Sequence, residues 1–247
     1  MQVIAHRGAS GDAPENTAAA FELAITMGAG FIETDVHKTS DGKLVLVHDA
    51  TLARTTDVRR QWFERAPWRV QDFTLAEIRG LTGAVPPLRE LLDLADGRTG
   101  LLLEVKSPAL YPGIGEVLAA ELEQAGWLGR EDLSVISFDW DFLAELKAAV
   151  PMVTVGVLGR PPALKQLAEL AAWATGVHPS HKHTDADFVA AVHEQGMVTY
   201  SGTTDNRHRM GELLDMGVDG IFTNRPDALI GVLQARSRTA GTACYPC

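Results

Sequence analysis

The chain contains 247 residues, of which 46% are hydrophobic and 22% charged, so the sequence is neither disordered nor collagen-like. One (β/α) barrel of about 250 residues would account for this length, with about three quarters of the unfolded chain's surface buried on folding. Lys and Arg number 22 against 32 Asp and Glu, a net charge of −10, which argues against a nucleic-acid-binding face and a polybasic membrane surface but not against a small anionic substrate.

Strand-like apolar runs and amphipathic helical stretches alternate along the chain. The runs lie at residues 3–5, 31–36, 43–47, 101–105, 133–137, 152–157, 174–177, 198–201 and 220–223. Helical stretches are predicted between the first two runs and later at residues 115–124, 142–149, 164–172, 185–194 and 209–216. The alternation implies parallel strands joined by right-handed crossovers. About eight such units predict an α/β fold, a (β/α)₈ TIM barrel; an open doubly wound sheet is the alternative, although no G-x-G-x-x-G sequence follows the first run.

One segment interrupts this alternation. Residues 49–97 contain two Trp, a Pro-Pro pair and two short helical patterns. They predict a small helical insertion after the second or third strand segment, covering one face of the barrel as a partial lid. We expect residues 1–234 to form a single domain and residues 235–247 to form a flexible C-terminal tail.

The first residues of the chain and the positions of its cysteines indicate the cellular compartment in which the protein works. The first residues lead directly into a strand-like run, without the basic segment and apolar stretch of a signal peptide, and no run approaches the about 18 apolar residues of a membrane span. The two cysteines, Cys244 and Cys247, lie at the C-terminal end, which excludes a disulfide framework for the body of the fold. These features predict a cytoplasmic protein without an integral membrane segment; they leave the oligomeric state open.

Titratable side chains stand where the early strand-like runs end. The four groups are His6-Arg7, Glu33-x-Asp35, His48-Asp49 and Glu104-x-Lys106. Residues two apart on a strand face the same side, and the carboxyl ends of parallel barrel strands meet at one rim. We therefore expect these side chains, distant in the sequence, to converge in space.

The acidic and basic members of this set indicate an anion site built around a metal. Glu33, Asp35 and Glu104 offer only oxygen ligands, which favours one hard divalent cation, Mg²⁺ or Ca²⁺, over zinc. Arg7 and Lys106 would add two cations beside it, and a phosphoryl group is the anion that such a set suits best.

The two histidines complete the set. An imidazole titrates near neutrality, so His6 and His48 suit one general base and one general acid. Taken singly, each of these charged residues has an equally good structural explanation, such as an ion pair. Seven of them on the rim of the early strands predict a catalytic site.

These residues belong to a larger set of motifs. The set comprises H-R-G-A-S at residues 6–10, P-E-N-T at 14–17, I-E-T-D-V at 32–36, D-G at 41–42, V-H-D at 47–49, L-E-V-K at 103–106, S-F-D at 137–139 and G-V-D-G-I at 217–221. Together they resemble the glycerophosphodiester phosphodiesterase family over nearly the whole chain. The resemblance implies a (β/α)₈ barrel and metal-dependent hydrolysis of glycerophosphodiesters to glycerol 3-phosphate and an alcohol. It places the catalytic histidines on His6 and His48, the metal ligands on Glu33, Asp35 and Glu104, and the phosphate-binding cations on Arg7 and Lys106.

The sequence departs from that family at one strand end. The family's seventh strand usually ends in a Trp-Thr pair, whereas this chain reads T-Y-S-G-T-T at residues 199–204. An aromatic wall beside the leaving alcohol is therefore missing or supplied by Tyr200. In the nearby group of His178, His181 and His183 we expect ordinary rim structure rather than a second metal site.

Three other functions remain open at this stage. One is a lysophospholipid-directed phosphodiesterase, similar to lysophospholipase D, that uses the same site. The second is a glycoside hydrolase, which would also use paired carboxylates, and the third is a catalytically silent phosphate-binding barrel. The sequence does not choose between Mg²⁺ and Ca²⁺, between the two histidines as base and acid, or between attack by water and a cyclic-phosphate intermediate.

Overall fold

The computed structural model describes residues 1–83 and 85–242, except for the side chains of residues 239–242. Eight parallel strands form its centre, in the order β7-β6-β5-β4-β2-β1-β9-β8. Their bounds are β1 (Gln2–His6), β2 (Phe31–Lys38), β4 (Gly100–Val105), β5 (Leu133–Ser137), β6 (Val155–Gly159), β7 (Gly176–Pro179), β8 (Tyr200–Ser201) and β9 (Gly220–Thr223). Parallel bridges from Gly176 to Val198 and from Ser180 to Gly202 join the two end strands and close the ring.

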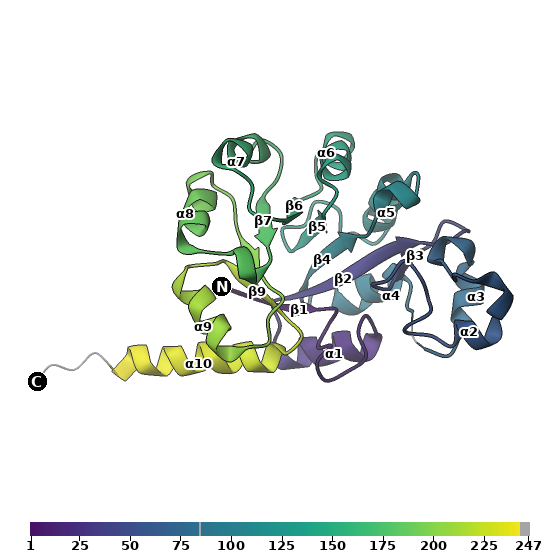
Figure 1. The fold of residues 1–247 in the computed structure, drawn as a ribbon, viewed down its shortest axis with the longest axis horizontal. Coiled ribbons are helices and arrows are strands. Elements are labelled where there is room, and N and C mark those ends of the chain that lie inside the picture. The colour runs from purple at the N-terminus through teal and green to yellow at the C-terminus, as the bar shows by residue number, and fades with distance from the viewer. Residues whose placement is uncertain (84, 243–247) are drawn as a thin grey trace, which may run out of the picture.

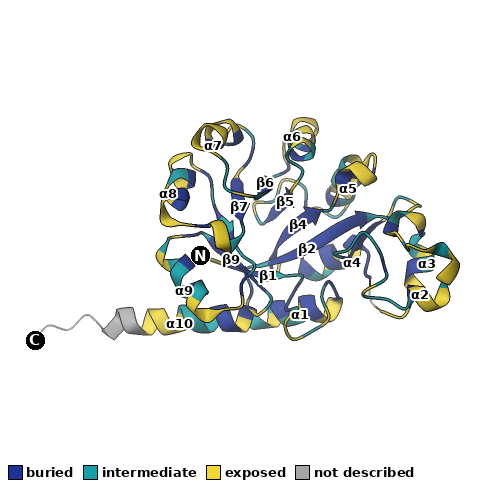
Figure 2. Cartoon of the chain, viewed as in Figure 1, coloured by how far each residue is buried: buried dark blue, intermediate teal, exposed yellow. Residues whose placement is uncertain are grey.

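One helix follows each barrel strand and covers the outside of the ring (Figure 1). These helices are α1 (Ala18–Met27), α4 (Leu88–Ala95), α5 (Ile114–Gln124), α6 (Trp140–Ala149), α7 (Leu164–Leu170), α8 (Ala186–Glu194), α9 (Arg207–Asp215) and α10 (Pro226–Thr242). Short 3₁₀ turns, Pro108–Leu110 and His181–His183, follow β4 and β7. The strands are buried and the helices turn exposed faces outward (Figure 2). The predicted (β/α)₈ barrel is confirmed.

The third apolar run, residues 43–47, does not form a barrel strand. It folds as β3 (Leu44–Leu46), which pairs antiparallel with β2 and lies outside the ring, with Leu46 opposite Val36. The expectation that all the apolar runs join one parallel sheet is therefore wrong for this run. An apolar run three to five residues long carries no signal for strand direction, since parallel and antiparallel partners bury the same side chains.

The predicted insertion lies between β2 and α4. It contains β3, α2 (Val58–Gln61), the 3₁₀ turns Phe63–Arg65 and Val70–Asp72, and α3 (Leu75–Arg79). A small core of its own holds it together, comprising Val45, Val47, Leu52, Val58, Val70, Phe73, Ile78, Leu81 and Val85. The sequence places its end near residue 97, but α4 packs in the main core of the barrel, so the insertion ends before Leu88. Its action as a partial lid stays a prediction.

The last helix extends beyond the predicted domain boundary. Helix α10 continues to Thr242, so residues 235–242 are helical and not part of a flexible tail. Arg236 forms an ion pair with Asp215 of α9, which ties this part of the helix to its neighbour. Residues 235–238 are exposed. Residues 243–247, including both cysteines, lie outside the described residues. None of the described helices is long and apolar enough to cross a membrane.

His178 fills space inside the barrel and does not join the two other histidines nearby. Its ring lies over Gly156 and Gly176, where a Cβ atom would collide with it, and stacks on Tyr200 at 4.7 Å between ring centroids. Burial lowers the pKa of His178 to about 3. The ring is therefore neutral in the folded protein over most of the pH range.

We expect the stability of the protein to fall in acid partly because of His178. An unfolded histidine titrates near pH 6.5, so the unfolded chain binds the extra proton first as the pH falls. The neutral ring contributes fully to the free energy of unfolding above pH 6.5. This contribution is lost progressively towards pH 3, at about 1.4 kcal/mol per pH unit. Denaturant unfolding followed by Trp fluorescence between pH 7 and pH 4 should give a shallower loss for His178→Gln than for the wild type. Equal slopes would contradict this.

Candidate active site

Six of the seven predicted site residues line one cleft of about 560 Å³ at the carboxyl ends of the strands. These six are His6, Arg7, Glu33, His48, Glu104 and Lys106. The seventh, Asp35, is fully buried and forms ion pairs with Arg7 and Lys106 at the floor of the site. The structure therefore brings the seven residues together, as the sequence predicts.

His48 reaches the cleft by a route that the sequence does not predict. Its strand-like run is β3, which is antiparallel, so His48 does not stand at the carboxyl end of a barrel strand. Instead, the chain leaving β3 is held against β2: Val47 donates its backbone N–H to the Asp35 carbonyl at 3.1 Å. The ring of His37 lies 3.3 Å from the carbonyl of His48. These contacts place His48 on the rim.

Three buried carboxylates form a compact cluster. Glu33, Asp35 and Glu104 each offer an oxygen, and these oxygens lie within 4.8 Å of one another. Register explains the convergence, since Asp35 of β2 lies directly opposite Glu104 of β4. Burial, followed by the charges of Asp35 and Glu104, raises the pKa of Glu33 well above its usual range. Burial also raises the pKa of Glu104. A bound cation would relieve the repulsion among these carboxylates and favour their ionised forms.

Two cations lie beside the carboxylates. Lys106 Nζ is 2.8 Å from Glu104 Oε1 and 3.4 Å from Asp35 Oδ1, and Arg7 Nε is 3.2 Å from Asp35 Oδ2. Asp35 Oδ1 is buried and receives no hydrogen bond from the described residues. A carboxylate oxygen without a hydrogen-bond donor, in a cluster of three carboxylates, fits a hard divalent cation. The carboxylate cluster is also the one group of three or more potential metal-binding side chains in the described part of the chain.

Asn16 supports the cluster from behind, a role that the sequence alone does not reveal. Its Nδ2 donates to Asp35 Oδ2 at 2.8 Å, and its Oδ1 accepts from Thr34 Oγ1 at 2.8 Å. The N-terminal cap of α1 is Thr17, whose hydroxyl accepts from the backbone N–H of Ala20. Asn16 therefore faces the site, while its neighbour begins the helix.

The two histidines have different partners. His6 Nδ1 lies 2.7 Å from the neutral amide of Asn224, and its Nε2 is 3.9 Å from Glu33 Oε2. Burial and then the charge of Arg7 lower the pKa of His6.

His48 is paired with an acid instead. Its Nδ1 lies 2.7 Å from Asp49 Oδ1. Arg54 donates to the same carboxylate and, together with His48, lowers the pKa of Asp49 to about 2. Arg54 also binds Glu15, which contacts Arg7, so an ion-pair chain links the surroundings of His48 to Arg7. The positions of Asn224 and Arg54 lie outside the sequence-based site.

The side chain of Tyr200 does not line the cleft. This residue packs inside the barrel between His178 and Phe222, so it does not supply the expected aromatic wall. Phe138 and Phe222 line the cleft instead, and Phe138 is 65% exposed.

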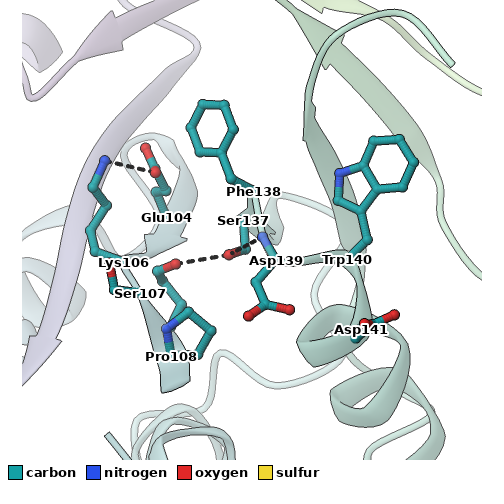
Figure 3. Close-up of a pocket in the computed structure, with 10 residues that line it drawn as sticks. Glu104, Lys106, Ser107, Pro108, Ser137, Phe138, Asp139, Trp140 and Asp141 are labelled. Carbon is teal, nitrogen blue, oxygen red and sulfur yellow. Dashed lines mark hydrogen bonds and ion pairs between the residues drawn. The ribbon is translucent and has the colours of Figure 1, made fainter. Parts of the chain in front are cut away.

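A second cleft, of about 570 Å³, adjoins the first and shares Glu104, Lys106 and Phe138 with it. In Figure 3 the Phe138 ring stands between the Glu104–Lys106 pair and Trp140. Asp139 lies in the same wall, where its side chain accepts a hydrogen bond from the Phe142 N–H and begins α6. An aromatic side chain therefore lies beside the charged end of the site, where the two clefts join.

Comparison with known proteins gives consistent matches. The model of the glycerophosphoryl diester phosphodiesterase family matches residues 6–228. A glycerophosphodiester phosphodiesterase of Bacillus subtilis (strain 168) is 34% identical, over 91% of this chain and 83% of the relative. One of Caldanaerobacter subterraneus subsp. tengcongensis is 33% identical, over 94% of this chain and 97% of the relative.

Solved structures agree with these matches. A putative glycerophosphoryl diester phosphodiesterase from Silicibacter pomeroyi DSS-3 superposes with a TM-score of 0.85 and 27% identity, covering 96% of this chain and 94% of the other. An Oleispira antarctica phosphodiesterase in complex with the product sn-glycerol-3-phosphate superposes with a TM-score of 0.83 and 28% identity, covering 95% of this chain and 97% of the other.

Proposed function

Because this chain belongs to the glycerophosphoryl diester phosphodiesterase family, we propose that it hydrolyses glycerophosphodiesters to glycerol 3-phosphate and an alcohol by metal-dependent acid–base catalysis. The chain is an enzyme of that family, a phosphoric diester hydrolase. The observation that carries the proposal is the convergence of three carboxylates, two cations and two imidazoles, six of them lining one cleft and Asp35 buried beside it. The solved relative from Oleispira antarctica, which holds sn-glycerol-3-phosphate, supports the same substrate class.

The proposed cofactor is one divalent cation, Mg²⁺ or Ca²⁺, held by Glu33, Asp35 and Glu104. When bound, it would supply Lewis-acid polarisation of a phosphoryl oxygen. Arg7 and Lys106 bind the remaining phosphoryl oxygens and offset the negative charge that grows on them during the reaction. Their ion pairs with Asp35 hold both cations in place before the substrate arrives.

The partners of the histidines suggest a division of roles. His6 Nδ1 lies 2.7 Å from Asn224 Oδ1, an acceptor, and a proton held on Nδ1 leaves Nε2 unprotonated to accept a proton from the nucleophile. His48 Nδ1 lies 2.7 Å from Asp49 Oδ1, and this contact orients the ring as the acid that donates a proton to the leaving alkoxide. Water and the glycerol hydroxyl next to the phosphate both suit such a base; the second gives a cyclic phosphate before hydrolysis.

A substrate panel tests the proposal. Purified protein with Mg²⁺ or Ca²⁺ should release glycerol 3-phosphate from glycerophosphocholine, glycerophosphoethanolamine or glycerophosphoglycerol. Faster turnover of lysophosphatidylcholine than of these diesters would favour a lysophospholipid-directed enzyme, and turnover of aryl glycosides alone would favour a glycoside hydrolase. Binding of glycerol 3-phosphate without turnover of any diester would identify a silent phosphate-binding barrel and contradict the proposal. The cytoplasmic location stays a prediction.

A further inference from the structure

The carboxylate of Asp205 lies behind His6 and is connected to it through the side chain of Asn224. Asp205 follows β8, and Asn224 follows β9. Asp205 Oδ1 accepts hydrogen bonds from Thr223 Oγ1 and from the backbone N–H of Asn224, both at 2.8 Å. Its Oδ2 accepts from Asn224 Nδ2, also at 2.8 Å. Asp205 lies outside the lining of the catalytic cleft, and the reaction proposed above gives it no role.

These contacts fix which way the amide of Asn224 points. An ionised carboxylate only accepts hydrogen bonds, so Asn224 must turn its NH₂ group to Asp205. Its oxygen is then directed at His6, 2.7 Å from Nδ1. The Ser10 hydroxyl lies 3.0 Å from the same oxygen, but its single proton is nearer the His6 carbonyl, 2.7 Å away, so the orientation rests on Asp205.

The orientation of the amide in turn fixes the tautomer of His6. An amide oxygen can only accept, so His6 Nδ1 must carry the proton. A neutral imidazole has one N–H, and Nε2 therefore keeps its lone pair, on the side of the ring that is 3.9 Å from Glu33 Oε2.

We propose that Asp205 is a positioning residue that sets the tautomer of His6 through Asn224. The inference rests on the proposed function for its effect on catalysis, but the tautomer itself is observable without any reaction. The competing explanation is that Asp205 merely joins the loops after β8 and β9, since three of its hydrogen-bond donors belong to that junction.

Asp205→Asn separates the two roles. The asparagine oxygen can still accept from Thr223 and from the backbone of Asn224, so the junction survives. Its NH₂ group would face the NH₂ group of Asn224, and this clash is relieved when the Asn224 amide rotates and presents its NH₂ group to His6. His6 must then accept at Nδ1 and carry its proton on Nε2. We expect kcat to fall by about 10²-fold or more, the range for loss of acid–base help, with a nearly unchanged KM.

The swapped pair, Asp205→Asn with Asn224→Asp, provides a rescue. The carboxylate introduced at position 224 would accept from both the new asparagine and His6, and would restore the Nδ1–H tautomer. We expect the kcat of this double variant to be at least about tenfold higher than that of Asp205→Asn, since His6 Nε2 is again free to accept a proton. Asp12→Asn is the matched control, because Asp12 pairs with Arg225 next to Asn224 but does not contact His6.

The decisive measurement is ¹⁵N NMR of the imidazole nitrogens in metal-free protein, with the His6 signals assigned by their loss in His6→Gln. The wild type, the control and the swapped pair should show protonated Nδ1 and free Nε2, and Asp205→Asn the reverse. An unchanged tautomer in Asp205→Asn, or an Asp205→Asn variant with full kcat on a substrate that the wild type hydrolyses, would overturn the inference. If Asp205→Asn does not fold, the folded swapped pair decides by its tautomer, and Nε2–H there would overturn the inference. Absence of wild-type diester turnover would refute the proposed function and leave the tautomer result standing.

Discussion

The variants His6→Ala and His48→Ala should each have a kcat for glycerophosphodiester hydrolysis about 10²–10⁴-fold below that of the wild type, the range for loss of a general acid or base. The two losses should differ with the leaving group. An aryl diester whose leaving group is a weak base needs little protonation. His48→Ala should therefore recover most of its activity on glycerol 3-(4-nitrophenyl phosphate), whereas His6→Ala should stay impaired on both substrates.

His208→Ala is the control for these variants, because His208 lies on α9 with an 85% exposed side chain and pairs only with Glu212 among the described residues. Circular dichroism of each variant checks that it is folded. A folded His48→Ala variant with full activity on alkyl diesters would refute the role of His48. Recovery by His6→Ala, and not by His48→Ala, on the aryl substrate would reverse the assignment of base and acid.

Asp35→Asn should cause the second large effect, because Asp35 is at the centre of the charged cluster. It is opposite Glu104 in the sheet and contacts both Arg7 and Lys106. The amide removes one of three negative charges and keeps the shape of the side chain. Changes to residues that only support the ligands of a metal typically lower metal affinity or activity by about 10–100-fold. Because Asp35 is itself a proposed ligand, we expect Asp35→Asn to lower both the metal affinity and kcat by more than this.

Calorimetric titration with Mg²⁺ and with Ca²⁺, together with the hydrolysis rate, measures these losses. Glu22→Gln, an equivalent carboxylate-to-amide change at an exposed ion pair with Arg98, should leave both quantities unchanged. If Asp35→Asn bound the cations as tightly as the wild type does, the carboxylate cluster would not be the metal site.

The sequence is sufficient to locate most of the site, for a physical reason. Parallel barrel strands all end at one rim, so polar residues in or just after the carboxyl-terminal parts of β1, β2 and β4 must converge even though about a hundred residues separate them. Glu33 and Asp35 also share a face because they are two residues apart on a strand. These rules need no knowledge of which strands are neighbours.

The features that the sequence misses depend on contacts between distant segments. Residues 43–47 are apolar like a barrel strand, and their antiparallel pairing with β2 follows only from how the insertion folds back. Asn224 and Asp205 are single polar residues after strands, and nothing local indicates that one contacts His6 and the other orients it. Residues 235–242 have no apolar periodicity of their own and continue a helix that is anchored by the buried Leu229.

The most direct test of the account is a metal add-back assay of product release. Protein stripped with a chelator should release no glycerol 3-phosphate from glycerophosphoglycerol, and addition of Mg²⁺ or Ca²⁺ should restore release in the wild type but not in Asp35→Asn. Undiminished release by the stripped protein, or no release with either ion, would contradict the claim that this cleft is a metal-dependent phosphodiesterase site.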